Sequence, residues 1–266
     1  MVLLGYSALL MNIGFLGTGH ITYSIILGIF KSKLKIKKIF ISPRNKIIAK
    51  KLSKRFKKVT IAKDNQQLIN KSSWVFLAIT PKVGSKILSK LNFKKNQKIV
   101  SFISTIDIPQ LKKYIGKNIK IVRAIPLPPI SNNLGPIPIC PPDKQVKGFF
   151  SKLGTVIEIK NEKLSKNFWV TSSMMAAFYE LLKLLSDWLV KRGVKRNEAQ
   201  KYITSLFVAL SEDALINSKK DLKYLVKSSQ TPRGLNEHAL KYLKKAGFYR
   251  RYSKSLNSIL KRLNNV

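Results

Sequence analysis

Apolar and polar positions follow different patterns in the two halves of the chain. From residue 12 to about residue 159, short apolar runs alternate with stretches of helical period. Parallel strands that helices cover on both faces are typically continuous apolar runs, so this half predicts an α/β domain on a parallel sheet. The predicted strands are 12–16, 38–41, 59–62, 74–79, 99–103 and 120–124, and the predicted helical stretches are 21–31, 46–56, 65–70, 83–91 and 109–115.

The second half of the chain shows only helical periodicity. The predicted helical stretches are 166–192, 195–218 and 235–263. The first stretch is apolar around much of its circumference, and its apolar residues include Phe168, Trp169, Met174, Met175, Phe178, Leu181, Leu182, Leu185, Trp188 and Leu189. A helix this apolar needs cover on most sides, which one small helical domain does not supply. We therefore predict an all-α C-terminal domain that forms an obligate homodimer.

A glycine-rich turn follows the first predicted strand and opens the first predicted helix. Its pattern, Gly17-x-Gly19-x-x-Thr22, is close to the dinucleotide-binding motif, with threonine at the third small position. Gly17 permits the tight turn, and Gly19 lets the backbone approach a pyrophosphate at the free N–H groups of the helix. The alternative is a purely structural glycine turn. Because the motif lies at the first strand–helix junction of an α/β pattern, the sequence favours a dinucleotide site.

The second predicted strand ends in Ser42-Pro43-Arg44, with no acidic residue nearby. An acid at this position binds the ribose 2′-hydroxyl of NAD, whereas a basic residue accommodates the 2′-phosphate of NADP. Arg44 can form paired hydrogen bonds to a phosphate, and Ser42 can add a hydroxyl donor. We therefore expect NADPH as the cofactor, with NADH as the alternative. The other interpretation of Arg44 is one surface cation among many.

These patterns predict two domains in a chain of 266 residues. We predict a Rossmann-type domain over residues 12–160 and a helical domain over residues 161–266. Residues 1–11 are predicted to be an extension before a working start near Met11. The apolar N-terminus is too short and too interrupted by glycine for a membrane span, and it lacks the basic start of a signal peptide. We expect a soluble, cytoplasmic protein.

The charge is extreme, with 51 Lys and Arg against 12 Asp and Glu and a formal net charge of +39. Such a charge is typical of proteins that bind nucleic acid or a membrane surface. The basic residues nevertheless punctuate nearly every segment from Lys31 to Arg262, without a zinc-finger or RNA-binding motif. A compositional bias is the favoured interpretation, so we expect no specific nucleic-acid partner and no membrane partner. The single cysteine, Cys140, lies among prolines with no nearby histidine, and we predict neither a nucleophile nor a metal site.

The chain resembles the pyrroline-5-carboxylate reductases from Asn12 to Leu263. The segments that carry the resemblance are Gly14 to Gly19, Ser42-Pro43-Arg44, Asp64-Asn65, Phe76 to Pro81, Val100-Ser101, Arg123 to Pro126 and Thr231-Pro232-Arg233-Gly234. The resemblance implies a Rossmann domain followed by a helical domain that interlocks with a second subunit. It also implies hydride transfer from NAD(P)H to the C=N carbon of a cyclic imine acid, in the first place 1-pyrroline-5-carboxylate, giving proline.

The same resemblance implies a set of cofactor residues. They are Gly17, Thr18, Gly19, His20 and Ile21 at the pyrophosphate, Ser42 and Arg44 at the 2′-phosphate, Asn65 at the adenosine side, and Ala78, Thr80 and Pro81 near the nicotinamide half. His20 is expected only to cap the pyrophosphate turn.

The predicted substrate loop departs from the family pattern Ser-Pro-Gly-Gly-Thr-Thr. The resemblance assigns to the substrate Thr231, Arg233, Gly234, Leu235 and Asn236. The loop opens a helix, so its backbone N–H groups can bind a carboxylate, and Arg233 adds charge where the family has glycine. Asn236 falls where the family has a threonine near the imine nitrogen. It is the candidate catalytic residue, as a hydrogen-bond donor and not as an acid.

Three other functions stay open. The altered loop and the bulkier segment Ser172 to Phe178 allow a different cyclic imine as substrate. A β-hydroxyacid dehydrogenase shares the glycine turn and a helical second domain, but the lysine pattern typical of that class is not found convincingly. A basic cofactor- or nucleic-acid-binding module is the non-enzyme alternative. A cyclic imine is protonated in water, so its reduction needs mainly proximity and orientation and no strong acid from the protein. His238 is therefore interpreted as a surface residue and not as a proton donor.

Overall fold

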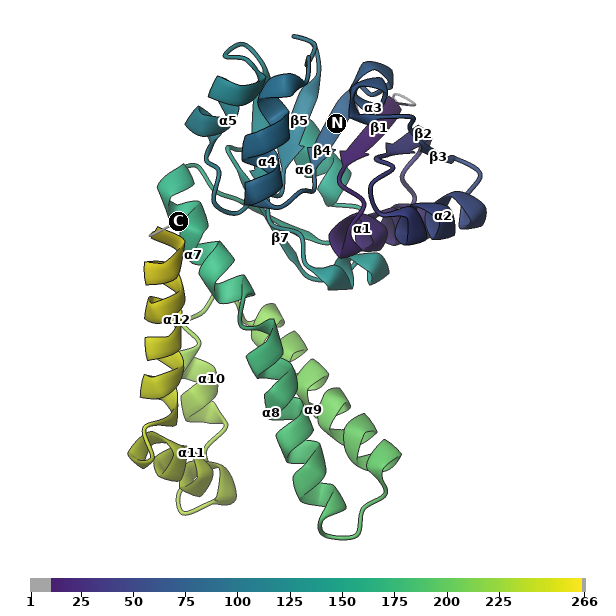
Figure 1. Cartoon of the computed structure of the whole chain (residues 1–266). Helices are drawn as coiled ribbons and strands as arrows, with labels where there is room; N and C mark the ends of the chain where they lie inside the picture. Colours follow the sequence, from purple (N-terminus) through teal and green to yellow (C-terminus); the bar gives the residue numbers. More distant parts are fainter. Residues whose placement is uncertain (1–10, 265–266) are drawn as a thin grey trace, which may run out of the picture. The chain divides into compact units, whose positions relative to one another are not determined.

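The computed structural model describes residues 11–264 and divides them into two compact units, residues 11–169 and residues 170–264. The predicted extension lies outside the described residues except for Met11, which begins the first strand. Figure 1 labels most of the helices and strands of both units. The predicted fold class, a Rossmann-type domain followed by helices, is confirmed.

Among the described residues, the first unit contains an eight-stranded sheet in the order β3-β2-β1-β4-β5-β6-β7-β8. The strands are β1 (Met11–Leu16), β2 (Ile36–Ile41), β3 (Val59–Ile61), β4 (Trp74–Leu77), β5 (Lys98–Ser101), β6 (Lys120–Ala124), β7 (Pro136–Cys140) and β8 (Thr155–Glu158). Strands β1 to β6 run parallel, whereas β7 is antiparallel to β6. The strand order reverses between β1 and β4, and dinucleotides bind outside the carboxyl ends of strands at such a switch point.

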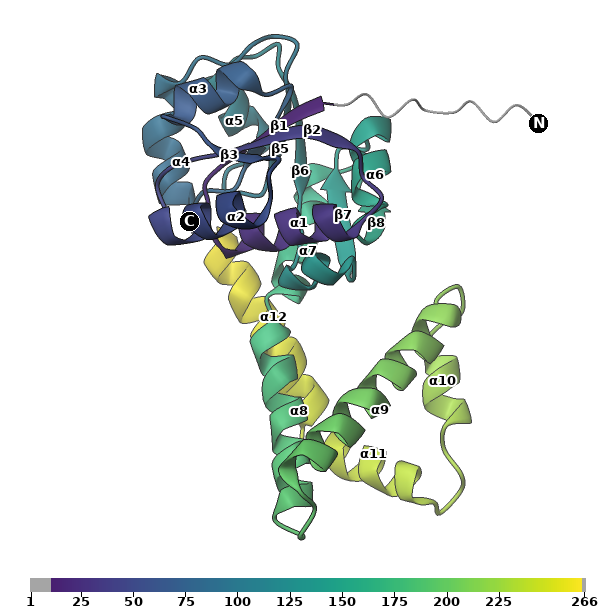
Figure 2. The same ribbon diagram turned by 90° about the vertical axis from the view of Figure 1, so that its right-hand side faces the viewer.

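Helices cover both faces of this sheet. The helices before the second unit are α1 (His20–Lys31), α2 (Lys46–Arg55), α3 (Asn65–Lys71), α4 (Pro81–Ile87), the 3-10 helix η1 (Leu88–Lys90), α5 (Ile108–Ile115), the 3-10 helix η2 (Pro128–Asn132) and α6 (Lys144–Phe150). Helix α7 (Glu162–Ser172) begins in the first unit and ends in the second. One apolar core joins the sheet to α1, α2 and α6, and a second joins it to α3, η1 and α5. Successive strand residues enter opposite cores, as Phe15 and Leu16 do. Helix α6 packs beside β7 and β8 (Figure 2).

The second unit is entirely helical in its described residues. After the end of α7 come α8 (Met175–Val190), α9 (Arg196–Ile216), α10 (Lys223–Ser228), α11 (Leu235–Lys245) and α12 (Phe248–Asn264). Helices α8 and α9 pack against each other after a turn at Gly193, and α11 and α12 meet at Gly247. Both glycines have positive φ, 92° and 73°, which is the usual way to end a helix.

Two predicted helical stretches differ from the structure in their continuity. The stretch 166–192 is interrupted between α7 and α8, where Ser173 donates its hydroxyl to Val170 O at 2.6 Å. Serine hydroxyls that bond to nearby carbonyls compete with helical hydrogen bonds, which explains a break that apolar periodicity does not show. The stretch 235–263 divides at Gly247 into α11 and α12.

Candidate cofactor and substrate sites

The turn between β1 and α1 depends on Gly17. This residue has φ 107°, and an added Cβ would lie 2.3 Å from the carbonyl oxygen of Ala78. Only glycine therefore fits this position without a shift of the backbone. Because Ala78 follows β4 and donates its own N–H to Leu16 O at 2.8 Å, the turns after β1 and β4 are held close together. Gly17 thus shapes the edge of the sheet at the switch point.

The N-terminus of α1 is open. In the described part of the chain, Gly19 precedes α1 in an extended conformation, no side chain caps the helix, and its first turn carries no acid. An added Cβ at Gly19 would meet no atom within 4 Å. Unpaired N–H groups and the positive end of the helix dipole at such a terminus attract an anion. The geometry therefore fits the pyrophosphate of a dinucleotide, with room for it to approach the backbone at Gly19.

Thr18 and Ser42 connect the glycine turn to the end of β2. Their exposed fractions are 3% and 2%. Thr18 Oγ1 donates to Ser42 O at 2.6 Å, and Gly17 N donates to Ser42 Oγ at 3.1 Å. Both side chains are therefore directed into the protein, and the predicted contact of Ser42 with a 2′-phosphate stays a prediction. Arg44 is exposed two residues later.

The predicted cofactor residues all lie at or just beyond the carboxyl ends of β1 to β4, which share one edge of the sheet. His20 is the exposed first residue of α1, and Ile21 beside it is half-buried. Asn65 is the half-buried first residue of α3, after the capping residue Asp64. Ala78 is half-buried, Thr80 is the exposed N-cap of α4, and Pro81 is its first residue.

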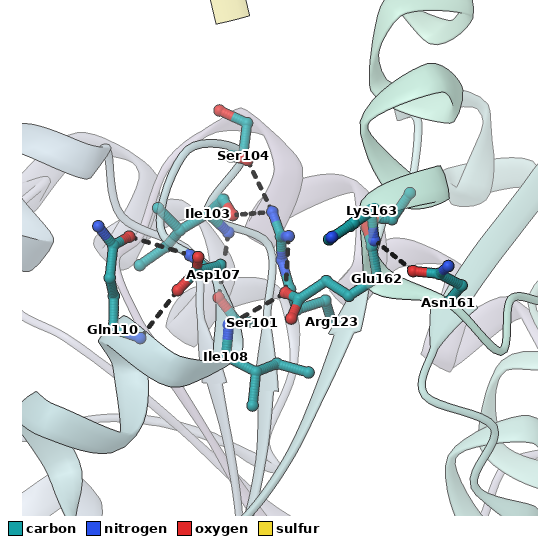
Figure 3. Close-up of polar contacts among 11 residues, drawn as sticks. Ser101, Ile103, Ser104, Asp107, Ile108, Gln110, Arg123, Asn161, Glu162 and Lys163 are labelled. Carbon is teal, nitrogen blue, oxygen red and sulfur yellow. Dashed lines mark hydrogen bonds and ion pairs between the residues drawn. The ribbon is translucent and has the colours of Figure 1, made fainter. Parts of the chain in front are cut away.

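An ion pair that the sequence analysis did not assign lies at the carboxyl ends of β5 and β6 (Figure 3). Arg123, with 3% of its surface exposed, donates from Nη1 to Glu162 Oε1 at 2.9 Å. Its Nη2 donates to Ile103 O at 3.1 Å and to Ser104 O at 2.6 Å. The available signal was an arginine that directly follows the apolar residues Ile121 and Val122 in a predicted strand. An arginine requires a partner when it is buried.

The predicted substrate loop lies in the second unit, before α11. Arg233 has φ 63°, the left-handed conformation that favours glycine, and its N–H donates to Glu237 Oε2 at 2.8 Å. Asn236 donates its side-chain amide to Ser229 O at 2.9 Å, while Leu235 is 89% exposed. The hydrogen bond from Lys241, followed by that from the Arg233 amide, lowers the pKa of Glu237. Glu237 is therefore an ionised cap near neutral pH and no proton donor.

Family models match both halves of the chain. The model described as "NADP oxidoreductase coenzyme F420-dependent" matches residues 12–106, and the model described as "Pyrroline-5-carboxylate reductase dimerisation" matches residues 162–266. The C-terminal part of the chain thus matches the dimerisation domain of the pyrroline-5-carboxylate reductases, and the chain is similar to that family. The resemblance stated from the motifs is thereby confirmed.

Individual pyrroline-5-carboxylate reductases align with most of the chain. The enzyme of Synechocystis is 27% identical over 199 residues, 71% of this chain and 73% of its own length. That of Escherichia coli is 24% identical over 251 residues, 89% and 91% of the two lengths. Two solved structures share the fold. The structure of the Streptococcus pyogenes reductase has a TM-score of 0.83 and 22% identity, and the match covers 96% of this chain and 99% of that one. The structure of the Plasmodium falciparum reductase with NADP bound has a TM-score of 0.81 and 20% identity, and the match covers 95% of this chain and 97% of that one.

The region that matches the dimerisation model exposes many apolar side chains. On α8 and α9 they include Phe178, Leu184, Trp188, Leu206, Val208, Leu210, Leu215 and Ile216. A hollow of about 390 Å³ between these two helices is lined by apolar residues such as Phe207 and Leu182. Surfaces this apolar are typical of protein interfaces, and together with the family model they support a homo-oligomer.

In residues 11–264, no group of three or more His, Cys, Asp and Glu residues is placed to hold a metal ion. None of the described helices is both long and apolar enough to cross a bilayer. Burial, followed by the negative charge of Glu162, raises the pKa of the Cys140 thiol. A buried thiol with a raised pKa is a poor nucleophile.

Proposed function

We propose that this protein reduces the C=N bond of 1-pyrroline-5-carboxylate with NADPH and forms proline. The observation that carries the proposal is the open N-terminus of α1 after a turn that requires Gly17, with Arg44 in place of an acid beyond β2. The relatives named pyrroline-5-carboxylate reductase support the reaction, and the Plasmodium falciparum structure with NADP bound supports the cofactor.

In this proposal the residues of the first unit bind and orient the dinucleotide. Gly17, Gly19 and the first N–H groups of α1 hold the pyrophosphate, and the exposed Arg44 binds the 2′-phosphate. Thr18 and Ser42 keep the glycine turn in register with the end of β2 through their mutual hydrogen bonds. NADPH supplies the hydride, while Ala78, Thr80 and Pro81 line its nicotinamide half.

The second unit supplies the substrate loop in this proposal. The backbone N–H groups at the start of α11 and the Arg233 guanidinium bind the imine carboxylate. A protonated imine already carries a positive charge, so the hydride transfer needs orientation and no strong acid. Asn236 has the role of a hydrogen-bond donor to the imine nitrogen, for which it must exchange its present bond to Ser229 O.

The proposal also includes the assembly and the domain limits. We propose domains over residues 12–160 and 161–266, a cytoplasmic location, and a homodimer built through the exposed apolar faces of α8 and α9. Sedimentation at micromolar concentration is expected to give a dimer or a larger multiple of the chain. A monomer that binds NADPH would contradict the homodimer and leave the cofactor site intact.

A panel of imines tests the reaction. Initial rates of NADPH and NADH oxidation are measured with 1-pyrroline-5-carboxylate and with cyclic imine acids of other ring sizes. We expect the highest kcat/KM for 1-pyrroline-5-carboxylate with NADPH, and proline as the product. Turnover of another imine alone would favour the alternative that the substrate is a different cyclic imine acid. The charged Arg233, at a position where the family has glycine, suggests this alternative. Absence of turnover with every imine would overturn the proposal.

A further inference from the structure

We propose that the Arg123–Glu162 ion pair is a positioning device for the nicotinamide half of the cofactor. It holds the loop between β5 and α5, residues 102–107, at the carboxyl edge of the sheet. The inference rests on the proposed function, because it names residues that act on the same cofactor site through the backbone.

The pair connects three segments that are distant in the sequence. Arg123 is the penultimate residue of β6, Glu162 begins α7, and Ile103 and Ser104 belong to the loop after β5. One guanidinium nitrogen, Nη2, donates to both loop carbonyl oxygens, at 3.1 and 2.6 Å. Glu162 Oε1 accepts from Arg123 Nη1 at 2.9 Å and from Ile108 N, the first residue of α5, at 3.0 Å (Figure 3). Both ends of the loop are therefore fixed by one ion pair.

The loop lies in line with the glycine turn along the edge of the sheet. The Ala78 N–H donates to Leu16 O at 2.8 Å, and the Phe102 N–H donates to Leu77 O at 3.0 Å. These bonds lead from the end of β1 through the end of β4 to the start of the loop. In a doubly wound sheet a dinucleotide spans the switch point, one half over each set of strands. Arg44 places the adenosine half beyond β2, so the nicotinamide half lies over β4, β5 and β6.

The cost of burying the Arg123–Glu162 ion pair indicates that the pair orients the loop and does not mainly stabilise the fold. Arg123 is buried, and its Nε is buried without a hydrogen-bond partner in the described structure. A buried ion pair is costly to desolvate, and well-packed apolar residues often replace one with no loss of stability. A guanidinium, however, provides a rigid fork of donors that an apolar side chain lacks. The loop carbonyls are the groups that this fork orients.

Glu162→Gln tests the inference, because it removes the charge and keeps an oxygen that accepts from Ile108 N. Binding of NADPH is compared with binding of adenosine 2′,5′-bisphosphate, which contains only the adenosine half, and kcat is measured with the imine. We expect the Kd for NADPH to rise about fivefold or more and kcat to fall about 10- to 100-fold, because small misplacements of a reacting group have effects of this size. The Kd for the bisphosphate is expected to change less than about twofold, which also shows that the variant is folded.

The matched control is Glu158→Gln, which removes an exposed carboxylate paired with Lys147. It is expected to change neither Kd nor kcat. If Glu162→Gln behaves like the control, or if it weakens both ligands equally, the positioning inference is overturned. If the wild-type protein binds adenosine 2′,5′-bisphosphate and NADPH but reduces no imine, the proposed reaction fails. The inference is then still decided by the two Kd values, because Glu162→Gln must weaken NADPH binding more than bisphosphate binding.

Discussion

Replacement of Ser42 by alanine separates two roles for this residue, a contact with the cofactor and a connection inside the protein. The Ser42 hydroxyl accepts from Gly17 N at 3.1 Å and lies 3.2 Å from Thr18 Oγ1. Alanine removes this oxygen at a site that is 2% exposed. Thr18 keeps its hydrogen bond to Ser42 O, because that acceptor belongs to the main chain.

The expected loss follows from the Gly17 amide. Leaving a buried donor unsatisfied costs about 1–3 kcal/mol. Gly17 is half-buried, so the lower part of this range, about 1–2 kcal/mol, is expected for the free energy of unfolding without cofactor. For a chain of this size that corresponds to a decrease of about 2–8 °C in Tm. Because the turn serves the pyrophosphate common to both nucleotides, KM is expected to rise by the same factor for NADPH and NADH.

Denaturant unfolding and initial rates with both nucleotides measure these effects. The matched control is Ser151→Ala, which removes an exposed hydroxyl that donates to Lys147 O at the C-terminal end of helix α6, and it is expected to change stability by less than about 0.5 kcal/mol. A rise in KM for NADPH alone, with unchanged stability, would show that the Ser42 hydroxyl binds the 2′-phosphate and would refute its role as an internal connection.

Two further substitutions test individual side chains. Arg44→Asp is expected to raise KM for NADPH about 10- to 150-fold more than KM for NADH, since it removes charged hydrogen bonds to the 2′-phosphate; equal effects on the two cofactors in initial-rate assays would exclude that contact. Arg233→Gly is expected to raise the free energy of unfolding by about 0.5–1 kcal/mol, because glycine adopts the left-handed conformation at φ 63° without steric cost. This value is the net effect, since the greater flexibility of glycine in the unfolded state offsets part of the stabilisation. Denaturant unfolding that shows a loss of stability would contradict this interpretation of the Arg233 backbone.

The sequence predicted those parts of the fold that periodicity alone determines. The predicted strand 120–124 has the same bounds as β6, and the parallel strands before it lie close to their predicted positions. Strand β7 was not predicted, because its sequence Pro136-Ile-Pro-Ile-Cys140 contains prolines that are atypical of an interior strand. The break between α7 and α8 was likewise hidden, since it depends on a serine hydroxyl and not on the apolar pattern.

The candidate sites were predicted where local motifs define them. The glycine turn needs only neighbouring residues, and its conformation follows from Gly17 and Gly19. Two features depend on contacts over long separations and were therefore not accessible. The bond between Gly17 and Ser42 joins residues 25 positions apart, and the Arg123–Glu162 pair joins residues 39 positions apart. The left-handed Arg233 was also unforeseen, although its alignment with a family glycine was the available signal.

The most direct measurement of the central claim is calorimetric titration of NADPH into the wild-type protein and the Gly19→Val variant. An added Cβ at Gly19 meets no atom within 4 Å, so the variant is expected to fold and to keep its stability within about 1 kcal/mol, the usual difference between N-cap residues. The same substitution at Gly148 on α6, where an added Cβ also meets nothing within 4 Å, is the control. We predict saturable binding by the wild type and by the control, and at least about tenfold weaker binding by Gly19→Val, because its side chain occupies the approach of the pyrophosphate. Equal NADPH affinities in all three proteins would contradict the claim that the open end of α1 holds the dinucleotide.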